Sequence, residues 1–229
     1  MVKKRLDAYI GKLNNKQIAE GVNVARRNAS RLAGDAELLL NNERYASAAS
    51  LAILSIEESG KEAIFRQLAT ASSDEEVKQI WKRYRTHIEK NFLGFVPKFI
   101  IEGAQKLEDF NDIFKADAEY RYILDMVKQK SFYSDCLGQA QWSEPYNVID
   151  KDVAVMLVET AKLYRKDGDM EEKEIELWVK HMGKVKGSNL RNQKVALLNW
   201  FAEMHELGLR HEEEKVEDVM QWLGLKFDK

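Results

Sequence analysis

Apolar residues recur every three or four places between positions 16 and 40, which is the period of an α-helix. The residues that carry this period are Ile18, Val22, Ala25, Ala29, Leu32, Ala36 and Leu39. Residues 44–68 are apolar on nearly all sides in their middle, as expected for a helix at the centre of a core. Only 2 of the 229 residues are proline and 12 are glycine, whereas sandwiches and barrels need more frequent turns. The sequence therefore predicts an all-α fold.

Helix-start signals predict further helices along the chain. Ser72 or Ser73, followed by three acidic residues, indicates the N-cap of a third helix that continues through His87. Further helical patterns are predicted at 109–130, 150–165 behind Asp150, 170–181, 188–207 behind Ser188 and, more weakly, 213–223.

Residues 131–147 carry aromatic side chains but no helical period, and they include Pro145. We expect an ordered, packed loop at this place, and it is the best candidate for a domain boundary. The predicted division is a helical bundle over residues 1–147 and a C-terminal helical extension over residues 148–229.

The charge balance excludes a protein that binds nucleic acid or membranes through its overall charge. Lys and Arg number 36 against 38 Asp and Glu, so the net charge is -2. The single cysteine, Cys136, has no partner for an internal disulfide, and residues 1–10 lack the apolar core of a signal peptide. No segment approaches the roughly 20 apolar residues of a membrane span. We expect a cytoplasmic protein without membrane contact.

A metal site or cofactor is not expected either. His181, His205 and His211 do not have the spacing of metal ligands, and Cys136 has no second cysteine beside it. The glycines at 11, 21 and 60 do not form a phosphate-binding loop.

A basic segment, residues 82–90, stands out in this acidic chain. Arg83 and His87 are four positions apart on one helix face, close enough to hold one phosphate between them. Such a pair suits ribonuclease chemistry, with His87 as general acid or base and the arginine stabilising the charge on the transition state. The alternative is a basic, solvated helix face with a surface histidine.

Polar side chains also interrupt the first two predicted helices. Asn28, Arg31 and Asp35 share one helix face, which is either part of a site or a solvated edge. Glu57 and Glu58 lie in the most apolar run of the chain, where a buried carboxylate needs a partner. A pair between Glu57 and Lys61, four residues apart, is one structural explanation.

Several segments together resemble a known family. They are GVNVARRNASRLAGDAELLLNNERYASAASLAILSIEESGK (residues 21–61), RYRTHIEKN (83–91), and KQKSFYSDC (128–136) followed by Trp142 and Pro145. In this order they resemble the AbiV-type abortive-infection family of bacteria, a branch of the HEPN superfamily of helical nucleotide-binding and ribonuclease domains. The resemblance covers roughly residues 15–147.

The resemblance implies a HEPN-like up-and-down helical bundle, here with additional C-terminal helices, that forms a homodimer. The basic motifs of two protomers would face a shared cleft, and the protein would defend bacteria against phage by arresting translation. RNA and a phage or host protein are the partners that it implies.

It also implies roles for individual residues. His87 is the expected general acid or base, and Arg83 and Arg85 are the expected phosphate clamps. The expected RNA or phosphate contacts are Lys82, Lys90, Asn91 and Tyr133, where stacking of Tyr133 on a base is weighed against simple packing on the bundle. The expected polar network of the cleft consists of Asn28, Asp35, Glu57, Glu58, Lys61 and Asp135.

Three functions remain open from the sequence. The first is a metal-independent endoribonuclease toxin, the second a non-catalytic module that binds a phage or host protein, and the third a nucleotide-phosphate sensor. Ribonucleases of the superfamily have a longer separation between Arg and His than the three residues between Arg83 and His87. Only Lys82 has that longer spacing, and lysine is a point charge instead of a bidentate fork. The spacing favours the second function.

Overall fold

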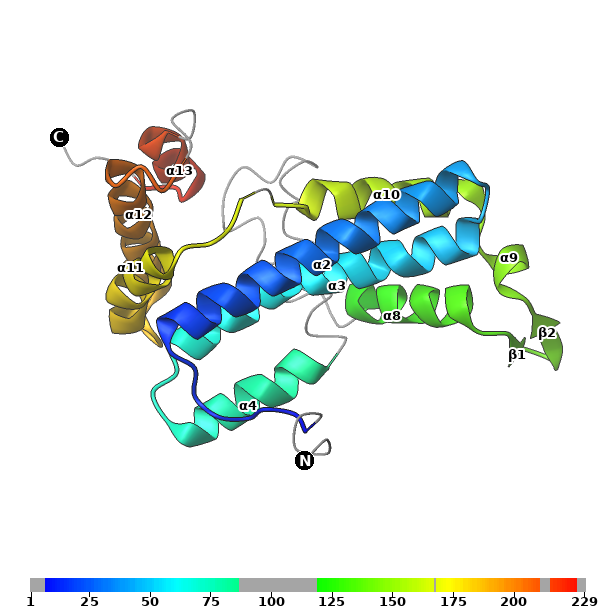
Figure 1. The fold of residues 1–229 in the computed structure, drawn as a ribbon, viewed down its shortest axis with the longest axis horizontal. Helices are drawn as coiled ribbons and strands as arrows, with labels where there is room; N and C mark the ends of the chain where they lie inside the picture. Colours follow the sequence, from blue (N-terminus) through cyan, green and yellow to red (C-terminus); the bar gives the residue numbers. More distant parts are fainter. Residues whose placement is uncertain (1–6, 87–118, 167, 211–214, 226–229) are drawn as a thin grey trace.

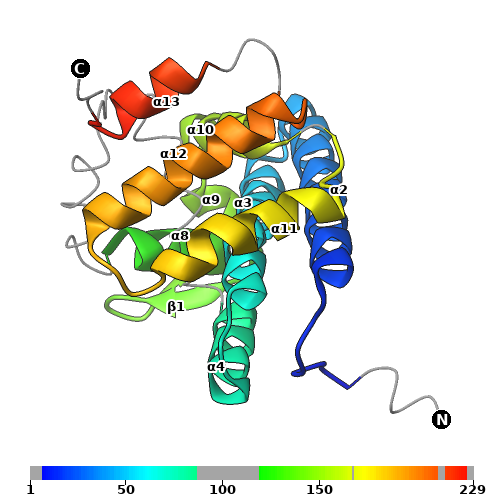
Figure 2. The ribbon, with the colours of Figure 1, turned by 90° about the vertical axis from the view of Figure 1, so that its left-hand side faces the viewer.

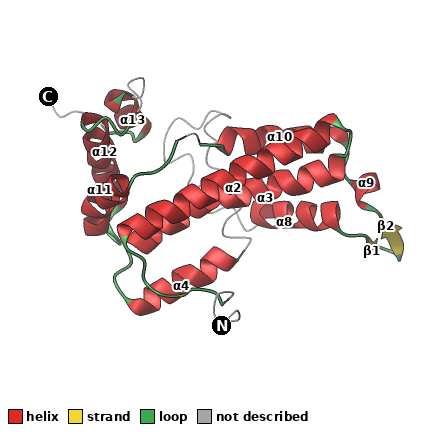
Figure 3. Cartoon of the chain, in the orientation of Figure 1, coloured by secondary structure: helices red, strands yellow, loops and turns green. Residues whose placement is uncertain are grey.

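The computed structural model describes residues 7–86, 119–166, 168–210 and 215–225. Within these ranges the chain consists of helices and one small two-stranded sheet, so the predicted all-α fold is confirmed (Figures 1 and 3). The helices are α2 (Asn15–Asn41), α3 (Tyr45–Ala69), α4 (Asp74–Arg85), α8 (Glu119–Phe132), α9 (Pro145–Val148), α10 (Lys151–Tyr164), α11 (Glu172–Met182), the short 3-10 helix η2 (Gly183–Val185), α12 (Leu190–Glu206) and α13 (Val216–Trp222). The strands are β1 (Asp135–Leu137) and β2 (Gln141–Ser143).

The two longest helices, α2 and α3, form an antiparallel pair at the centre of the molecule (Figure 1). A capping box between Asn14 and Gln17 starts α2, and a turn with Glu43 at a positive φ of 57° reverses the chain into α3. Small buried side chains allow the two backbones to approach closely, and Ser55 of α3 donates a hydrogen bond of 2.8 Å to the carbonyl of Ala29. At Gly21 a Cβ atom would lie 2.8 Å from the ring of Phe65, so this position has no room for a side chain.

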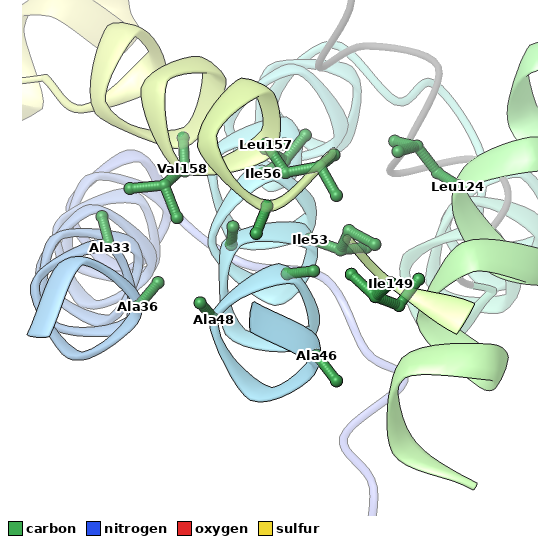
Figure 4. Packing of buried hydrophobic residues seen from close by; sticks show 14 of the residues in the cluster. Ala33, Ala36, Ala46, Ala48, Ile53, Ile56, Leu124, Ile149, Leu157 and Val158 are labelled. Carbon is green, nitrogen blue, oxygen red and sulfur yellow. The ribbon is translucent and has the colours of Figure 1, made fainter. Parts of the chain in front are cut away.

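Helices α10 and α8 cover the pair and complete the first hydrophobic core. Ile53 and Ile56 of α3 are buried between Leu157 of α10 and Leu124 of α8, and Ile149 closes the end of the cluster (Figure 4). Asp150 caps α10 as predicted, because its side chain accepts a hydrogen bond from the N–H of Val153. Helix α10 begins shortly after residue 147. The division of the chain into two parts at that residue stays a prediction.

A second core lies at the other end of α2 and α3 and includes both α4 and α11. Ile18 and Val22 of α2 pack with Phe65 of α3, Trp81 of α4 and Ile175 of α11. Figure 2 shows α11 and α12 lying across this end of the bundle. The C-terminal helices therefore share a core with the long pair, and a third cluster holds α11, α12 and α13 together.

Residues 131–147 differ from the packed loop expected there. They contain an antiparallel hairpin in which Cys136 pairs with Trp142, followed by α9. Trp142 of β2 is 81% exposed and Tyr146 of α9 is 72% exposed, so aromatic side chains of this segment face solvent. We call residues 132–146, the hairpin with its flanking aromatic residues, the aromatic hairpin. At two other predicted boundaries the shifts are small: α12 is capped by Asn189 instead of Ser188, and Ser73 is the cap of α4. The third predicted helix is shorter than expected, because α4 ends at Arg85. Residues 109–118 of the helix predicted at 109–130 lie outside the described residues.

One buried carboxylate joins the long pair to the C-terminal helices. Glu62 of α3 accepts hydrogen bonds from Arg26 of α2 at 3.0 Å, from Arg66 at 2.8 Å and from Lys166, just after α10, at 3.1 Å. Only 7% of Glu62 is exposed. The three cations come from three different segments, so the carboxylate acts as a common anchor.

The cations of Glu62 extend this anchor to α11 and α12. The guanidinium carbon of Arg66 lies 4.8 Å from the ring centre of Trp178 in α11 and 5.0 Å from that of Trp200 in α12. Arg26 also donates a hydrogen bond to the carbonyl of Gly168 at 3.1 Å. Next to it, the side chain of Asn23 exchanges two hydrogen bonds with the backbone of Met170, which precedes α11.

The charges around Glu62 determine how it titrates. Burial alone would raise its pKa, but the positive charges of Arg66, Lys166 and Arg26 outweigh burial and lower the pKa from 4.5 to about 2. A carboxylate with a depressed pKa stabilises the fold above its unfolded pKa. This contribution is lost as the pH falls through the folded pKa.

We therefore expect Glu62→Gln to flatten the acid dependence of stability. Between about pH 5 and pH 2 the free energy of unfolding of the wild type should fall by roughly 3 kcal/mol more than that of the variant. Urea denaturation at a series of pH values measures both. Glu20→Gln, which removes an exposed carboxylate from α2, is the control and should follow the wild type. Parallel curves for wild type and Glu62→Gln would contradict the assigned role.

Candidate functional site

The basic segment predicted to carry the chemistry begins in the last turn of α4. This helix buries Val77, Ile80 and Trp81 on one face, which leaves Lys82, Arg83 and Arg85 exposed. His87, Lys90 and Asn91 lie outside the described residues. The C-cap of α4, Thr86, has an extended backbone, so the helix face that was expected to carry both Arg83 and His87 ends at Arg85.

Arg85 binds the segment that precedes α2. Its guanidinium donates hydrogen bonds to the carbonyl of Tyr9 at 2.6 Å and to that of Trp81 at 3.2 Å, and its carbon lies 5.3 Å from the Trp81 ring centre. The indole N–H of Trp81 in turn donates to the carbonyl of Gly11 at 2.8 Å. Arg85 thus contributes one hydrogen bond, and Trp81 another, to holding residues 9–11 against α4.

Arg83 faces a different direction, because residues two positions apart lie on opposite sides of a helix. It lines a pocket of about 470 Å³ together with Arg66 of α3, Glu76 of α4 and Lys186. Across the parts of the chain that the structure describes, its guanidinium makes no hydrogen bond or ion pair. Within one protomer, Arg83 and Arg85 are not brought to the same anion position, and their catalytic assignment stays a prediction.

Glu57 is paired with a lysine that the sequence reasoning missed. It is 2% exposed, and the Nζ atom of Lys128 in α8 donates to it at 2.7 Å and lies 3.0 Å from Asp125. The suggested pair between Glu57 and Lys61 is therefore wrong. The only signal for Lys128 was its place in the family-like segment KQKSFYSDC, since it lies 71 residues from Glu57 along the chain.

Glu58 and Lys61 do lie beside the basic helix. The Nζ atom of Lys61 is 2.5 Å from Glu58 and 5.0 Å from the ring centre of Tyr84 in α4. Both side chains are less than one-fifth exposed, at 14% for Lys61 and 18% for Glu58. Their pairing with each other contributes to the packing of α3 against α4, and Glu57, which contacts α8, is separate from it.

The first-helix residues form a solvated edge. Arg31 donates to Asn28 at 3.0 Å and to Asp35 at 2.8 Å, and the side chains of Arg31 and Asp35 are 61% and 48% exposed. Exposed pairs of this kind contribute little to stability. The structure therefore agrees with the solvated-edge interpretation of this face.

Tyr133 and Asp135 lie at the aromatic hairpin, at the opposite end of the bundle from α11 (Figure 1). Tyr133 is 63% exposed and contacts the ring of Phe132. Most such tyrosines pack against their own bundle, but Tyr133 is exposed instead. The hydrogen bond from Lys130 at 2.8 Å, with a smaller effect from the N–H of Cys136, lowers the pKa of Asp135.

The described residues contain no cluster of His, Cys, Asp and Glu side chains that could hold a metal ion. Cys136 is an exposed free thiol. Among the helices in the described ranges, none is long and apolar enough to cross a membrane.

The comparison with known proteins agrees with the helical architecture. Residues 17–166 match the family model HEPN_AbiV, described as AbiV, which therefore extends from α2 through α10. No curated protein and no solved structure matches the chain. Since the family model spans well over half of the 229 residues, the chain belongs to the AbiV family of HEPN proteins.

Proposed function

We propose that this AbiV-family chain is an abortive-infection protein that arrests translation by binding a protein of the phage or host, without cutting RNA. The observation that carries the proposal is the position of Arg85, whose guanidinium is bound to the carbonyls of Tyr9 and Trp81. Homodimerisation, which the family resemblance implies, is part of the same proposal.

Cleavage of RNA without a metal needs a base or acid and a cation that converge on one phosphate. Of the two arginines in the basic segment, Arg85 holds the segment before α2, and Arg83 faces the pocket with Arg66 and Lys186. Lys82 has the longer spacing to His87, but an ammonium does not reproduce the bidentate grip of a guanidinium. This arrangement supports binding over catalysis.

The aromatic hairpin supports a protein partner. The exposed fractions are 81% for Trp142, 72% for Tyr146, 63% for Tyr133 and 43% for Phe132. Tryptophan and tyrosine are enriched in protein interfaces and dominate their binding energy, and exposed apolar patches commonly mark interaction sites. We therefore assign the partner contact to this hairpin.

Removing the two most exposed aromatic side chains should abolish defence. The double variant Trp142→Ala, Tyr146→Ala is expected to lose phage protection by about tenfold or more, since such residues are typical interface hot spots. Plating efficiency of phage on cells that express the protein measures this. Leu163→Ala, which removes a 60% exposed apolar side chain from α10, is the matched control and should keep protection. Full protection by the double variant would exclude the hairpin as the contact.

RNA should stay intact in the presence of the purified protein. We expect no cleavage of total RNA or tRNA in EDTA, and His87→Ala should still protect cells. Gel analysis of the RNA and phage plating give the two readouts. Cleavage by the wild type that is lost in His87→Ala would overturn the proposal and favour the endoribonuclease, which is the competing function.

A further inference from the structure

A groove between α11 and α12 lies outside the part of the chain that matches the family model. Its lining residues are Lys180 and His181 of α11, Lys184 and Val185 of η2, and Arg191, Asn192, Val195, Ala196 and Asn199 of α12. Those of α12 recur every three or four positions, so they share one face of that helix. Figure 2 shows the two helices side by side across the end of the bundle. We call this hollow of about 390 Å³ the C-terminal groove.

The C-terminal groove belongs to a segment whose formal charges are all positive. Residues 177–202 contain five Lys and Arg side chains and no Asp or Glu, although the whole chain has a net charge of -2. Three of the five, Lys180, Lys184 and Arg191, line the groove. The field of such a segment attracts negatively charged groups to the hollow.

Two of these three cations are available to a ligand. Lys180 donates to Glu203 at 2.6 Å, and Nε2 of His181 lies 2.6 Å from the same carboxylate, so Glu203 already balances that side of the groove. Across the described residues, Lys184 and Arg191 make no hydrogen bond or ion pair, and both are exposed. Carboxylates suit such a site, because the planar fork of arginine matches both of their oxygens.

The C-terminal groove also has an apolar wall and two amides. Val185, Val195 and Ala196 line it beside the cations, and Val195 is 41% exposed. Asn192 and Asn199 add side-chain amides, which can donate to and accept from a peptide backbone. An aliphatic side chain and its main chain can therefore be bound together with carboxylates.

We propose that the C-terminal groove binds an acidic segment of another protein, whose carboxylates contact Lys184 and Arg191 and whose aliphatic side chain packs on Val195. Arginine clusters are a recurring means of recognising acidic motifs. The groove lies at the opposite end of the bundle from the aromatic hairpin (Figure 1), so this proposal goes beyond the proposed function and does not depend on the hairpin contact. It gives the C-terminal helices a binding role of their own.

Nucleic acids and membranes fit the C-terminal groove less well. Among the described residues that line it, none is Phe, Tyr or Trp, whereas proteins that bind single strands stack the bases on aromatic side chains. A helix that binds a membrane surface needs a broad apolar face. Here the aliphatic side chains line a hollow between two helices instead.

Fluorescence anisotropy of the full chain tests the proposal with two short labelled peptides, one of Glu-Glu-Leu repeats and one of Asp-Asp-Leu repeats. At least one peptide should saturate a single site per chain. Its Kd should be about tenfold or more below that of the same peptide with amides in place of the carboxylates, and replacing its leucines by serine should also raise the Kd. The double variant Lys184→Ala, Arg191→Ala should raise the Kd about tenfold or more, because it removes both available cations.

Three further variants locate the binding site. Val195→Ser changes no charge and should also weaken the peptide. The double variant Lys78→Ala, Lys151→Ala removes two exposed cations, from α4 and α10, that do not line the groove, and it should leave the Kd unchanged. The double variant Trp142→Ala, Tyr146→Ala should bind the peptide as the wild type does, which separates this site from the aromatic hairpin.

The proposal is overturned if neither peptide saturates, or if the amide peptides bind as tightly as the acidic ones. Equal losses in the groove variant and in Lys78→Ala, Lys151→Ala would overturn it too, because they would mean attraction to positive charge in general. A single-stranded RNA of equal length and phosphatidylserine vesicles are measured in parallel. Tighter binding of either one that depends on Lys184 and Arg191 would also overturn it, since the groove would then serve nucleic acid or a membrane.

Discussion

The close packing of α2 on α3 is the constraint on which the rest of the structure depends. Alanines at the contact, with no side chain at Gly21 and a hydrogen bond from Ser55 to the carbonyl of Ala29, bring the two backbones near each other over their whole length. Every other helix of the two main cores packs on this pair: α8 and α10 at one end, α4 and α11 at the other. The basic segment and the aromatic hairpin are therefore positioned by helices that pack on the α2–α3 pair.

Two buried carboxylates on α3 form ion pairs with cations from the segments that pack around it. Glu57 binds Lys128 of α8, and Glu62 binds cations from α2, α3 and the segment before α11. Buried ion pairs often add little net stability because desolvation opposes them, but a wrong register leaves their charges buried and unpaired. We infer that these pairs favour the observed positions of α8 and of the segment before α11. Ion pairs between acidic and basic residues thus link helices of this nearly neutral chain.

Structural features that depend on residues close together in the chain could be predicted from the sequence. The helical period located α2 and α3 within a residue or two, and Asp150 and Ser73 marked helix starts through local hydrogen bonds. Contacts between distant residues were not predictable: Lys128 meets Glu57 only because α8 packs beside α3, and Arg85 donates to the carbonyl of Tyr9 only because residues 9–11 fold back onto α4. The hairpin was misjudged for another reason, since aromatic residues normally indicate burial and here they face solvent. The helical fold that the family resemblance implied is confirmed, and the match to the family model extends through α10.

The bundle of α2 to α10 and the C-terminal helices α11 to α13 are joined through Glu62 and the rings that contact Arg66, and we expect them to form one cooperative unit. Native-state hydrogen exchange, followed by mass spectrometry at increasing denaturant, tests it most directly. We expect amides in α11 and in the middle of α3 to exchange through the same global opening, with equal free energies. Exchange of α11 with a free energy well below that of α3 would contradict it, because the C-terminal helices would then open on their own.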